Sequence, residues 1–211
     1  IAAYVLQQML EQQITALPYS VPEGSVSQFV KFVQLLHKWN ATYNLTSVRD
    51  MKLMVTRHIL DSIVINPFLA GKQILDVGSG AGLPGIPLAI LNPELHFTLV
   101  DSNNKKTRFI QQAVTELGLA NVTVITERIE NFHPEQRFDT VVGRAYSAIE
   151  NLIAGVQHLL SGNAVILAMK GTYPVAELES ISDGYKVDRV EPLIVPGLDA
   201  ERHLVIIRPD S

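Results

Sequence analysis

The chain of 211 residues contains no cysteine. This absence excludes disulfide bonds, zinc–thiolate sites and iron–sulfur clusters, and it removes any cysteine nucleophile. Charged residues are also scarce, at 18% of the chain, whereas 47% of the residues are hydrophobic. Such a composition is apolar enough for a sizeable buried core, and the length suits one domain with a short extension.

An excess of positive charge is missing as well, because the formal net charge is −4. Nucleic-acid binding would therefore need a local basic patch. Candidate patches, whose charges are most often simply solvated, are Lys105, Lys106 and Arg108, then Arg49, Lys52 and Arg57, then Arg144 and Lys170. No apolar run reaches the roughly 18 residues of a membrane helix. We expect a cytoplasmic monomer without membrane contact.

The order of the predicted elements indicates an α/β fold. Residues 1–70 show only helical periodicity, which predicts an N-terminal helical cap. Residues 71–211 alternate strands and helices, which predicts a Rossmann-like domain with a parallel sheet. Strands are expected at 73–77, 96–100, 122–126, 140–142 and 164–169, with helices at 84–91, 105–117, 148–160 and 175–181.

The end of the chain departs from this alternation. Two further strand-like stretches, 186–195 and 203–208, are joined by a segment too short for a crossover helix. They predict a terminal antiparallel hairpin. A parallel sheet with this ending is unlike the usual dinucleotide-binding sheet.

A glycine-rich turn between a predicted strand and a predicted helix is the most informative segment. It reads Asp76-Val77-Gly78-Ser79-Gly80-Ala81-Gly82-Leu83-Pro84-Gly85. Closely spaced glycines permit a sharp bend and let a ligand approach without interference from Cβ atoms. The turn also satisfies G-x-G-x-x-G, so on its own it does not choose between ligand classes. Asp101, after the second strand, is a candidate acceptor for ribose hydroxyls in either class.

Three features favour S-adenosylmethionine over NAD(P) as the ligand. Asp76 precedes the glycines, where a carboxylate would repel a pyrophosphate but can face an ammonium group. The turn has no nearby Arg or Lys to meet a phosphate. The terminal hairpin is typical of methyltransferase sheets. Asp76 also has a purely structural interpretation as a cap of the turn.

Candidate residues follow the later strands too. Ile129 and Glu130 follow the third strand and are expected beside the adenine, although Glu130 is equally compatible with a solvated loop acid. Arg144 and Lys170 follow the fourth and fifth strands. Since ligands bind at the carboxyl ends of strands in open α/β sheets, we predict that both reach the site as catalytic and substrate-binding residues.

The residues reduce the range of candidate methyl acceptors but do not identify the acceptor. Methylation of pyrimidine C5 usually needs a cysteine, and methylation of exocyclic amines commonly uses an Asn/Asp-Pro-Pro-aromatic motif where this chain has Gly143-Arg144-Ala145-Tyr146-Ser147. The histidines show no metal-ligand spacing, so no metal is expected. An acceptor that needs no deprotonation, such as guanine N7, is compatible with cationic neighbours.

Several segments in combination resemble one bacterial family. They are Leu36-His37-Lys38-Trp39-Asn40 with Tyr43-Asn44-Leu45-Thr46-Ser47-Val48-Arg49, Arg57-His58-Ile59-Leu60-Asp61-Ser62, Gly82-Leu83-Pro84-Gly85-Ile86-Pro87, Arg144-Ala145 with Ser147, Lys170-Gly171, and Glu201-Arg202-His203-Leu204-Val205. Together they resemble the bacterial small-subunit rRNA guanine-N7 methyltransferases, the glucose-inhibited division protein B family. The resemblance covers nearly the whole chain.

This resemblance implies methylation of a guanine at N7 in the 530 loop of 16S rRNA of the small ribosomal subunit, with S-adenosylmethionine as donor. It implies cofactor contacts at Gly78, Leu83, Ile129, Glu130 and Arg144, with Asp101 at the ribose. Asp76, Ser79, Gly80 and Gly82 complete the predicted cofactor set. Ser79 and Ala81 replace the Thr and Pro that relatives often carry, a small change for the turn.

The helical cap is expected to form the RNA-facing side of the cleft, with Asn44, Arg49 and His58 as contributors. The polar stretch from Asn40 to Asn44 also has an interpretation as helix-capping residues. Two other functions stay open at this point. They are an NAD(P)-dependent oxidoreductase and a non-catalytic ribosome- or RNA-binding protein that retains the fold.

Overall fold

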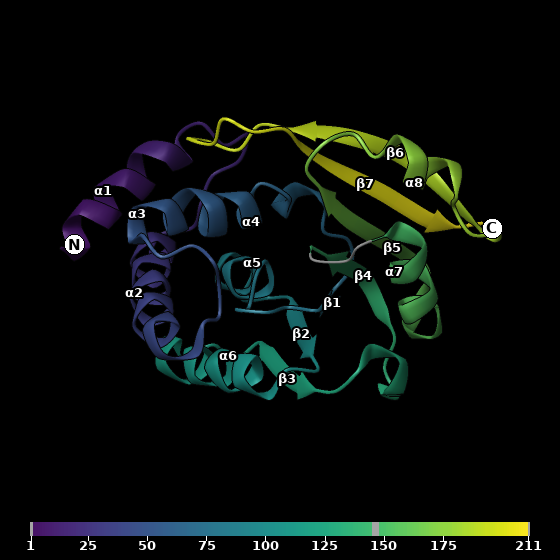
Figure 1. Cartoon of the computed structure of the whole chain (residues 1–211), viewed down its shortest axis with the longest axis horizontal. Coiled ribbons are helices and arrows are strands. Elements are labelled where there is room, and N and C mark those ends of the chain that lie inside the picture. The colour runs from purple at the N-terminus through teal and green to yellow at the C-terminus, as the bar shows by residue number, and fades with distance from the viewer. Residues whose placement is uncertain (1, 145–147, 211) are drawn as a thin grey trace.

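The chain is organised around a seven-stranded sheet with the strand order β3-β2-β1-β4-β5-β7-β6 (Figure 1). The computed structural model describes residues 2–144 and 148–210. β1 to β5 run parallel, and β7 runs antiparallel to both β5 and β6. The strands are β1 Gln73–Val77, β2 His96–Asp101, β3 Val122–Thr126, β4 Phe138–Gly143, β5 Leu160–Lys170, β6 Tyr185–Leu193 and β7 Arg202–Pro209. The predicted parallel sheet with a terminal antiparallel hairpin is confirmed.

Helices cover both faces of this sheet. The α-helices are α1 Ala3–Ile14, α2 Ser25–Tyr43, α3 Met51–Met54, α4 Asp61–Ile63, α5 Gly85–Leu91, α6 Asn104–Leu117, α7 Ile149–Val156 and α8 Val175–Glu179. A π-helical turn, η1, spans Val55–Leu60, and the 3-10 turns are η2 Asn66–Phe68, η3 Ile129–Asn131 and η4 Gln157–Leu159. No helix in the described part of the chain is long and apolar enough to cross a membrane.

Alternating side chains of each strand divide the core between the two faces. In β1, Ile74 belongs to the cluster that includes the buried residues of α1, α2, α5 and α6. Leu75 and Val77 belong to the second cluster, with the buried residues of α7. The helices of residues 1–70 therefore bury their apolar faces in the same core as α5 and α6. The expected boundary near residue 70 stays a prediction.

Local sequence signals explain where the main helices begin and end. Residues at helical spacing on α2, among them Phe29, Phe32 and Leu36, are fully buried. The helix ends at Asn44, which adopts the left-handed conformation. In α6, the side chain of Asn103 accepts a hydrogen bond from the Lys106 N–H at 3.2 Å, and Gly118 terminates the helix in the same left-handed conformation.

The helical periodicity of residues 1–70 did not indicate that regular helix is interrupted after Met54. A π-helical turn follows α3, and the N–H of Asp61 donates to the carbonyl of Thr56, five residues earlier. Such a turn rotates the following residues relative to a regular α-helix, and π-turns of this kind are frequent at functional sites. It brings His58 and Asp61 into buried positions, both at most 5% exposed.

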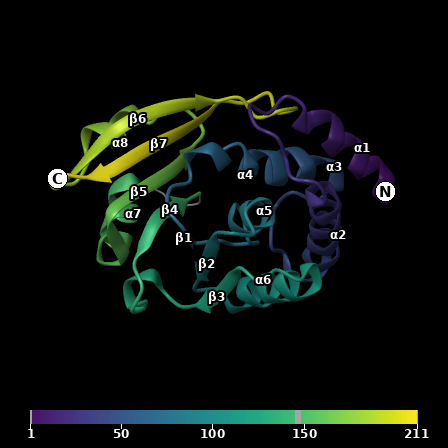
Figure 2. The same ribbon diagram turned by 180° about the vertical axis from the view of Figure 1, so that it is seen from behind.

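The loop between β6 and β7 connects the hairpin to the N-terminal helices. Figures 1 and 2 show this loop reaching from the hairpin toward α1, and Gly197 within it lies against Thr56 and Gln13. The hairpin also places Arg202 at the start of β7, opposite Leu193 of β6. As a result, residues from the end of the chain meet residues from η1 and α4.

Candidate functional site

The glycine-rich turn links β1 to α5 and folds back over the end of β2. The N–H groups of Gly78 and Ser79 both donate to the carbonyl of Val100, at 2.8 and 3.2 Å. Gly78 has a φ of 68°, a conformation that residues with a Cβ rarely adopt. A Cβ on Gly85 would lie 2.7 Å from Oδ2 of Asp76. Glycine at position 85 therefore lets the Asp76 carboxylate approach the start of α5.

Asp76 is the most strongly perturbed acid of the turn. Its side chain is buried, and its Oδ2 accepts a hydrogen bond from the Gly85 N–H at 2.8 Å. Its Oδ1 has no hydrogen-bond partner among the residues that the structure describes. Burial raises the pKa of Asp76 to about 7, against the opposing effects of the Gly85 N–H, the Ser79 hydroxyl and the Arg144 charge. Asp76 thus caps the turn, and its Oδ1 keeps acceptor capacity that no described residue uses.

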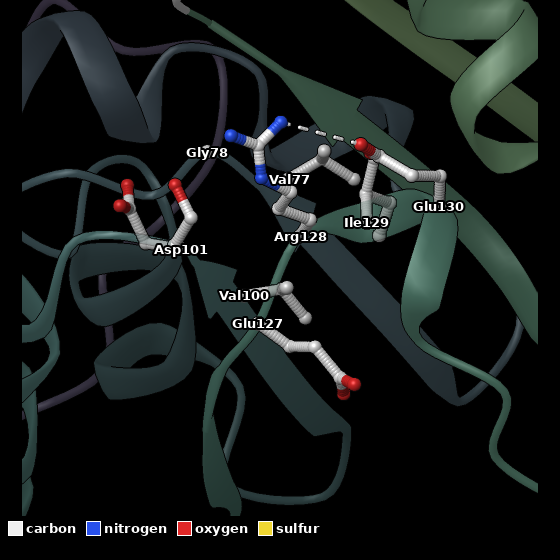
Figure 3. Close-up of a pocket in the computed structure, with 9 residues that line it drawn as sticks. Val77, Gly78, Val100, Asp101, Glu127, Arg128, Ile129 and Glu130 are labelled. Atoms are coloured by element: carbon white, nitrogen blue, oxygen red, sulfur yellow. Dashed lines mark ion pairs between the residues drawn. The ribbon is translucent and has the colours of Figure 1, made fainter.

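A cavity of about 330 Å³ lies between the ends of β1, β2 and β3. Its lining includes the predicted residues Gly78, Asp101, Ile129 and Glu130. Figure 3 shows the Asp101 carboxylate on one side of this cavity and Ile129 with Glu130 on the other. Its volume lies within the range of about 300–1,000 Å³ that is typical of small-molecule sites.

The Asp101 carboxylate is held by two backbone donors. Oδ2 accepts from the Gly80 N–H at 2.9 Å and Oδ1 from the Asn103 N–H at 2.8 Å. Each carboxylate oxygen can accept a second hydrogen bond, so both remain available to ligand hydroxyls. Across the cavity, Glu130 forms a long ion pair of 3.7 Å with Arg128, and both side chains are exposed. Glu130 is therefore a solvated loop acid at the rim, and its role toward the cofactor stays a prediction.

Replacing Asp101 with alanine is expected to weaken binding of S-adenosylhomocysteine by roughly 5- to 150-fold, the equivalent of about 1–3 kcal/mol for a charged hydrogen-bond acceptor. Titration calorimetry measures the dissociation constant. Asp188→Ala is the matched control, because Asp188 is an exposed acid that pairs with Arg208 on the terminal hairpin. An unchanged dissociation constant in Asp101→Ala would show that Asp101 does not hold the ribose.

Arg144, at the end of β4, belongs to a charge cluster that joins three distant parts of the chain. Its Nη2 lies 3.4 Å from Oδ2 of Asp61 and donates to the carbonyl of Arg57 at 2.8 Å. Oδ1 of Asp61 pairs with Nε of Arg202 at 3.0 Å. Burial lowers the pKa of Arg144, and the carboxylates of Asp61 and Asp76 oppose this effect. One buried carboxylate thus orients two guanidinium groups, and the cluster keeps a net positive charge.

Removing the charge of Asp61 tests how this cluster is held. Asp61→Asn is expected to lower the free energy of unfolding by about 3 kcal/mol, the lower end of the range for a broken buried pair, because the two arginines keep some solvent contact. Urea denaturation measures the loss. Asp188→Asn, in an exposed pair with Arg208, should lose no more than about 1 kcal/mol. Equal losses in the two variants would contradict a structural role for the buried carboxylate.

His58 lies beside this cluster and is buried. Its Nε2 is 2.8 Å from Oγ1 of Thr46, and its Nδ1 has no partner within residues 2–144 and 148–210. Burial, reinforced by the positive charge of Arg144, lowers the pKa of His58 to about 4. His58 is therefore neutral near pH 7 and offers no charge to RNA phosphates. Its predicted contact with RNA is untested.

The polar connector after α2 is internally hydrogen-bonded. Oδ1 of Asn44 accepts from Nη2 of Arg49 at 2.6 Å. The buried Asn40 accepts from the Thr46 N–H at 2.9 Å and donates to the Val48 carbonyl at 3.2 Å. These contacts give Asn40 and Asn44 structural roles at the helix end. Asn44 and Arg49 remain exposed, and RNA binding by them stays a prediction.

Lys170 lies at the carboxyl end of β5, as predicted. Its Nζ pairs with Oε1 of Glu177 at 2.8 Å, and the same oxygen accepts from the N–H of Ile149, the first residue of α7, at 2.9 Å. Glu177 therefore balances the charge of Lys170 and ties it to the start of α7. A catalytic or RNA-binding role for Lys170 stays a prediction.

The structure distributes the predicted residues over two neighbouring groups. Gly78, Asp101, Ile129 and Glu130 line the cavity, whereas Ser79, Gly80, Gly82 and Leu83 shape the turn behind it. Arg144 and His58 belong to the adjoining polar cluster. The segment 145–147, which contributed to the family resemblance, lies outside the described residues. Across the described part of the chain, no group of three or more His, Asp or Glu side chains is arranged to hold a metal ion.

Two residues of the site were not predicted from the sequence, although both lie in segments that carried the resemblance. Asp61 stands in the apolar stretch Ile59-Leu60-Asp61-Ser62-Ile63-Val64, and Arg202 begins β7. An isolated acid in an apolar helical stretch must find a partner when it is buried. That signal was available for Asp61. Its partners lie more than 80 residues away in sequence and could not be inferred.

Three features define the class of protein. They are the sheet order with β7 antiparallel between β5 and β6, the glycine turn after β1 and the acid at the end of β2. The chain is a Rossmann-like methyltransferase dependent on S-adenosylmethionine. The NAD(P)-dependent oxidoreductase is not favoured. More specifically, the chain belongs to the family of rRNA small subunit methyltransferase G, which it matches over residues 25–205.

Close relatives span almost the entire chain. Ribosomal RNA small subunit methyltransferase G of Photobacterium profundum is 47% identical over 202 residues, covering 96% of this chain and 98% of that protein. The protein of the same name from Marinobacter nauticus is 48% identical over 198 residues, covering 94% and 92% of the two chains. These matches include both the predicted helical cap and the sheet.

Solved structures share the fold at much lower sequence identity. A glycopeptide N-methyltransferase complexed with S-adenosyl-L-homocysteine aligns with a TM-score of 0.62 and 13% identity, over 72% of this chain and 87% of that one. A SAM-dependent methyltransferase from Thiobacillus denitrificans in complex with S-adenosyl-L-homocysteine aligns with a TM-score of 0.51 and 14% identity, over 72% of this chain and 90% of that one. At this level of identity the likeness concerns the architecture alone.

Proposed function

We propose that this chain transfers the methyl group of S-adenosylmethionine to N7 of a guanine in the 530 loop of 16S rRNA. The observation that carries the proposal is the family match over residues 25–205. It is supported by Oδ1 of Asp76, a buried acceptor in the glycine turn that has no partner among the described residues. We further propose that the protein acts in the cytoplasm as a monomer on the small ribosomal subunit.

The residues of the turn fit the cofactor. Oδ1 of Asp76 suits an α-ammonium group, which would also lower the pKa of this acid and keep it ionised. The Asp101 carboxylate retains acceptor capacity for two ribose hydroxyls, and Ile129 supplies apolar surface for the adenine. When bound, the cofactor supplies a methyl group on a positively charged sulfur, which a lone pair can displace.

The acceptor chemistry matches the side chains near Arg144. Guanine N7 carries a lone pair and has no proton to lose, so no general base is required. This agrees with a site where His58 is buried and Lys170 is paired with an acid. In this proposal, Arg144 and Arg202 hold the O6 edge of the base or a neighbouring phosphate, both of which guanidinium groups bind well. Asp61 keeps the two guanidinium groups in place.

A labelled-methyl assay tests the proposal. Small subunits that lack the modification are incubated with protein and S-adenosylmethionine labelled in the methyl group, and the modified nucleotide is mapped. The expected result is one labelled guanine in the 530 loop, sensitive to cleavage after N7 methylation. Incorporation elsewhere, or none at all with a protein that binds S-adenosylhomocysteine, would overturn it. The second outcome would favour the non-catalytic RNA-binding alternative.

A further inference from the structure

A second cavity, of about 390 Å³, lies where the end of α2 meets the beginning of α6. We call it the α2–α6 groove, and it is lined by Trp39, Tyr43, Lys105, Arg108 and Gln112. Of the described residues that line it, none is acidic, in a chain whose net charge is −4. It therefore combines aromatic rings with a local concentration of positive charge.

The groove follows from the antiparallel packing of the two helices. Gln28, near the start of α2, donates to the Leu117 carbonyl at the end of α6, at 2.8 Å, so the end of α2 faces the beginning of α6. Trp39 and Tyr43 are four residues apart on α2, and Lys105 and Arg108 are three apart on α6. These spacings place each pair on one face of its helix.

The aromatic part of the groove is held in place from below. The Trp39 ring packs against Phe109, a fully buried residue, with ring centres 5.8 Å apart. The Tyr43 ring lies 5.2 Å from that of Trp39 and is 42% exposed. The exposed Tyr43 ring is thus backed by the half-buried Trp39 ring, which in turn rests on the buried Phe109. Lys105 and Arg108 are exposed beside it.

We infer that the α2–α6 groove binds a single-stranded nucleotide of the rRNA flanking the target guanine, with its base on Tyr43 and its phosphate on Lys105 and Arg108. This inference rests on the proposed function. Proteins that bind single-stranded nucleic acid combine aromatic stacking surfaces with cationic side chains along the backbone path in this way. A protein partner would have to meet the two cationic side chains with acidic ones, and we treat it as an outcome of the test.

The position of the groove relative to the cofactor cavity supports this assignment. Asp101 and Ser102 line the cofactor cavity, and α6 begins at Asn104, directly after them. Lys105 therefore lies in the first turn of this helix, four residues after Asp101. A strand that placed its guanine beside Arg144 could continue across the same edge of the sheet to the groove.

Binding to protein-free RNA gives the direct test. Tyr43→Ala is expected to weaken binding of a fluorescent hairpin RNA carrying the 530-loop sequence by roughly 5- to 150-fold, the equivalent of about 1–3 kcal/mol per stacked base. Tyr43→Phe should bind within about twofold of the unaltered protein, since the ring is kept. Arg108→Ala should reduce the slope of log Kd against log salt by about 0.7. Fluorescence anisotropy across a salt series measures both effects.

Controls separate the groove from general effects. Tyr4 is an exposed aromatic residue on α1, and Lys72 is exposed at the opposite, amino-terminal edge of β1. Tyr4→Ala and Lys72→Ala should leave RNA affinity unchanged. Thermal denaturation and the dissociation constant of S-adenosylhomocysteine establish that Tyr43→Ala is folded and keeps its cofactor site. In methyl transfer, Tyr43→Ala should raise KM for unmodified small subunits with little change in kcat.

The RNA-binding experiments test the groove separately from the proposed function. If folded Tyr43→Ala and Arg108→Ala bind the hairpin as tightly as the unaltered protein, the inference is overturned. Weaker binding to small subunits but not to hairpin or protein-free 16S rRNA would also overturn it and indicate a ribosomal protein as partner. If the unaltered protein transfers no methyl group to rRNA, the proposed function fails, whereas the anisotropy measurement still decides whether the groove binds RNA.

Discussion

Replacing Arg144 with alanine is expected to reduce the rate of methyl transfer by roughly 100- to 1,000-fold, the effect of removing a positioned donor from a catalytic site. The reason is its place between Asp61 and the glycine turn, where its charge acts on both Asp61 and Asp76. The free energy of unfolding should fall by only about 1–3 kcal/mol, because Asp61 keeps its pairing with Arg202. Single-turnover transfer to unmodified small subunits measures the rate.

Two further variants serve as controls for the effect of Arg144→Ala on the rate. Arg208→Ala is the matched control, since Arg208 pairs with an acid on the exposed hairpin and lies far from the turn in sequence. Arg144→Lys keeps the charge but not the two-pronged geometry, and it should recover only part of the rate. A large loss of thermal stability in Arg144→Ala with its activity intact would contradict the assignment.

Replacing Asp76 with asparagine is expected to weaken binding of S-adenosylhomocysteine by roughly 30- to 5,000-fold, the equivalent of about 2–5 kcal/mol for one partner of a buried charge pair. Without ligand, the variant should be at least as stable at pH 8 as the unaltered protein. The physical reason is that an amide oxygen can still accept from the Gly85 N–H, while the substitution removes a buried charge whose Oδ1 has no partner among the described residues.

The pKa of Asp76 sets the pH dependence of both effects. Burial raises this pKa from 3.8 to about 7, so the folded protein favours the protonated form. Below pH 3.8, Asp76 is protonated in both the folded and the unfolded chain and does not lower the free energy of unfolding. As the pH rises toward 7, the unfolded chain ionises first, so the free energy of unfolding falls progressively. Above pH 7 the loss is complete. The stability advantage of Asp76→Asn should therefore grow with pH over this interval.

Ligand affinity should respond to pH in the same range. An ammonium group needs the ionised carboxylate, so affinity for S-adenosylhomocysteine should fall as the pH drops below about 7. Calorimetric titration between pH 5.5 and 8.5, with urea denaturation at the same pH values, measures both quantities. If the unaltered protein and Asp76→Asn bound the ligand with the same affinity at every pH, Asp76 would not be the residue that receives the ammonium group.

Much of the fold was predictable because its signals are local. Apolar runs bounded by polar segments located the strands, and the predicted range 122–126 coincides with β3. The short connection before residue 203 predicted the antiparallel pair, since so few residues cannot form a crossover. The glycine turn was recognisable because closely spaced glycines with a preceding acid constrain the backbone and the ligand charge within ten residues.

The partners inside the site were not predictable, because they depend on contacts between remote segments. The helical periodicity within residues 1–70 could not show the π-helical turn that carries His58, since a single wider turn is too short to be distinguished in the apolar pattern. Lys170 gave no sign of its pairing with Glu177. Nor could the basic run of residues 105–108 show that an exposed tyrosine from α2 lies beside it.

The sequence by itself therefore determined the class of fold, the glycine turn at which we propose the cofactor binds, and the family, because each rests on short segments whose chemistry is complete within them. Only the tertiary structure decided which charges oppose one another. Asp61, Arg144 and Arg202 come from three separate elements, and their pairing depends on how α4, β4 and β7 pack. Because these charges are buried, the pairing is required for stability: a charge removed from water is destabilising unless it has a partner, and only the folded chain supplies that partner.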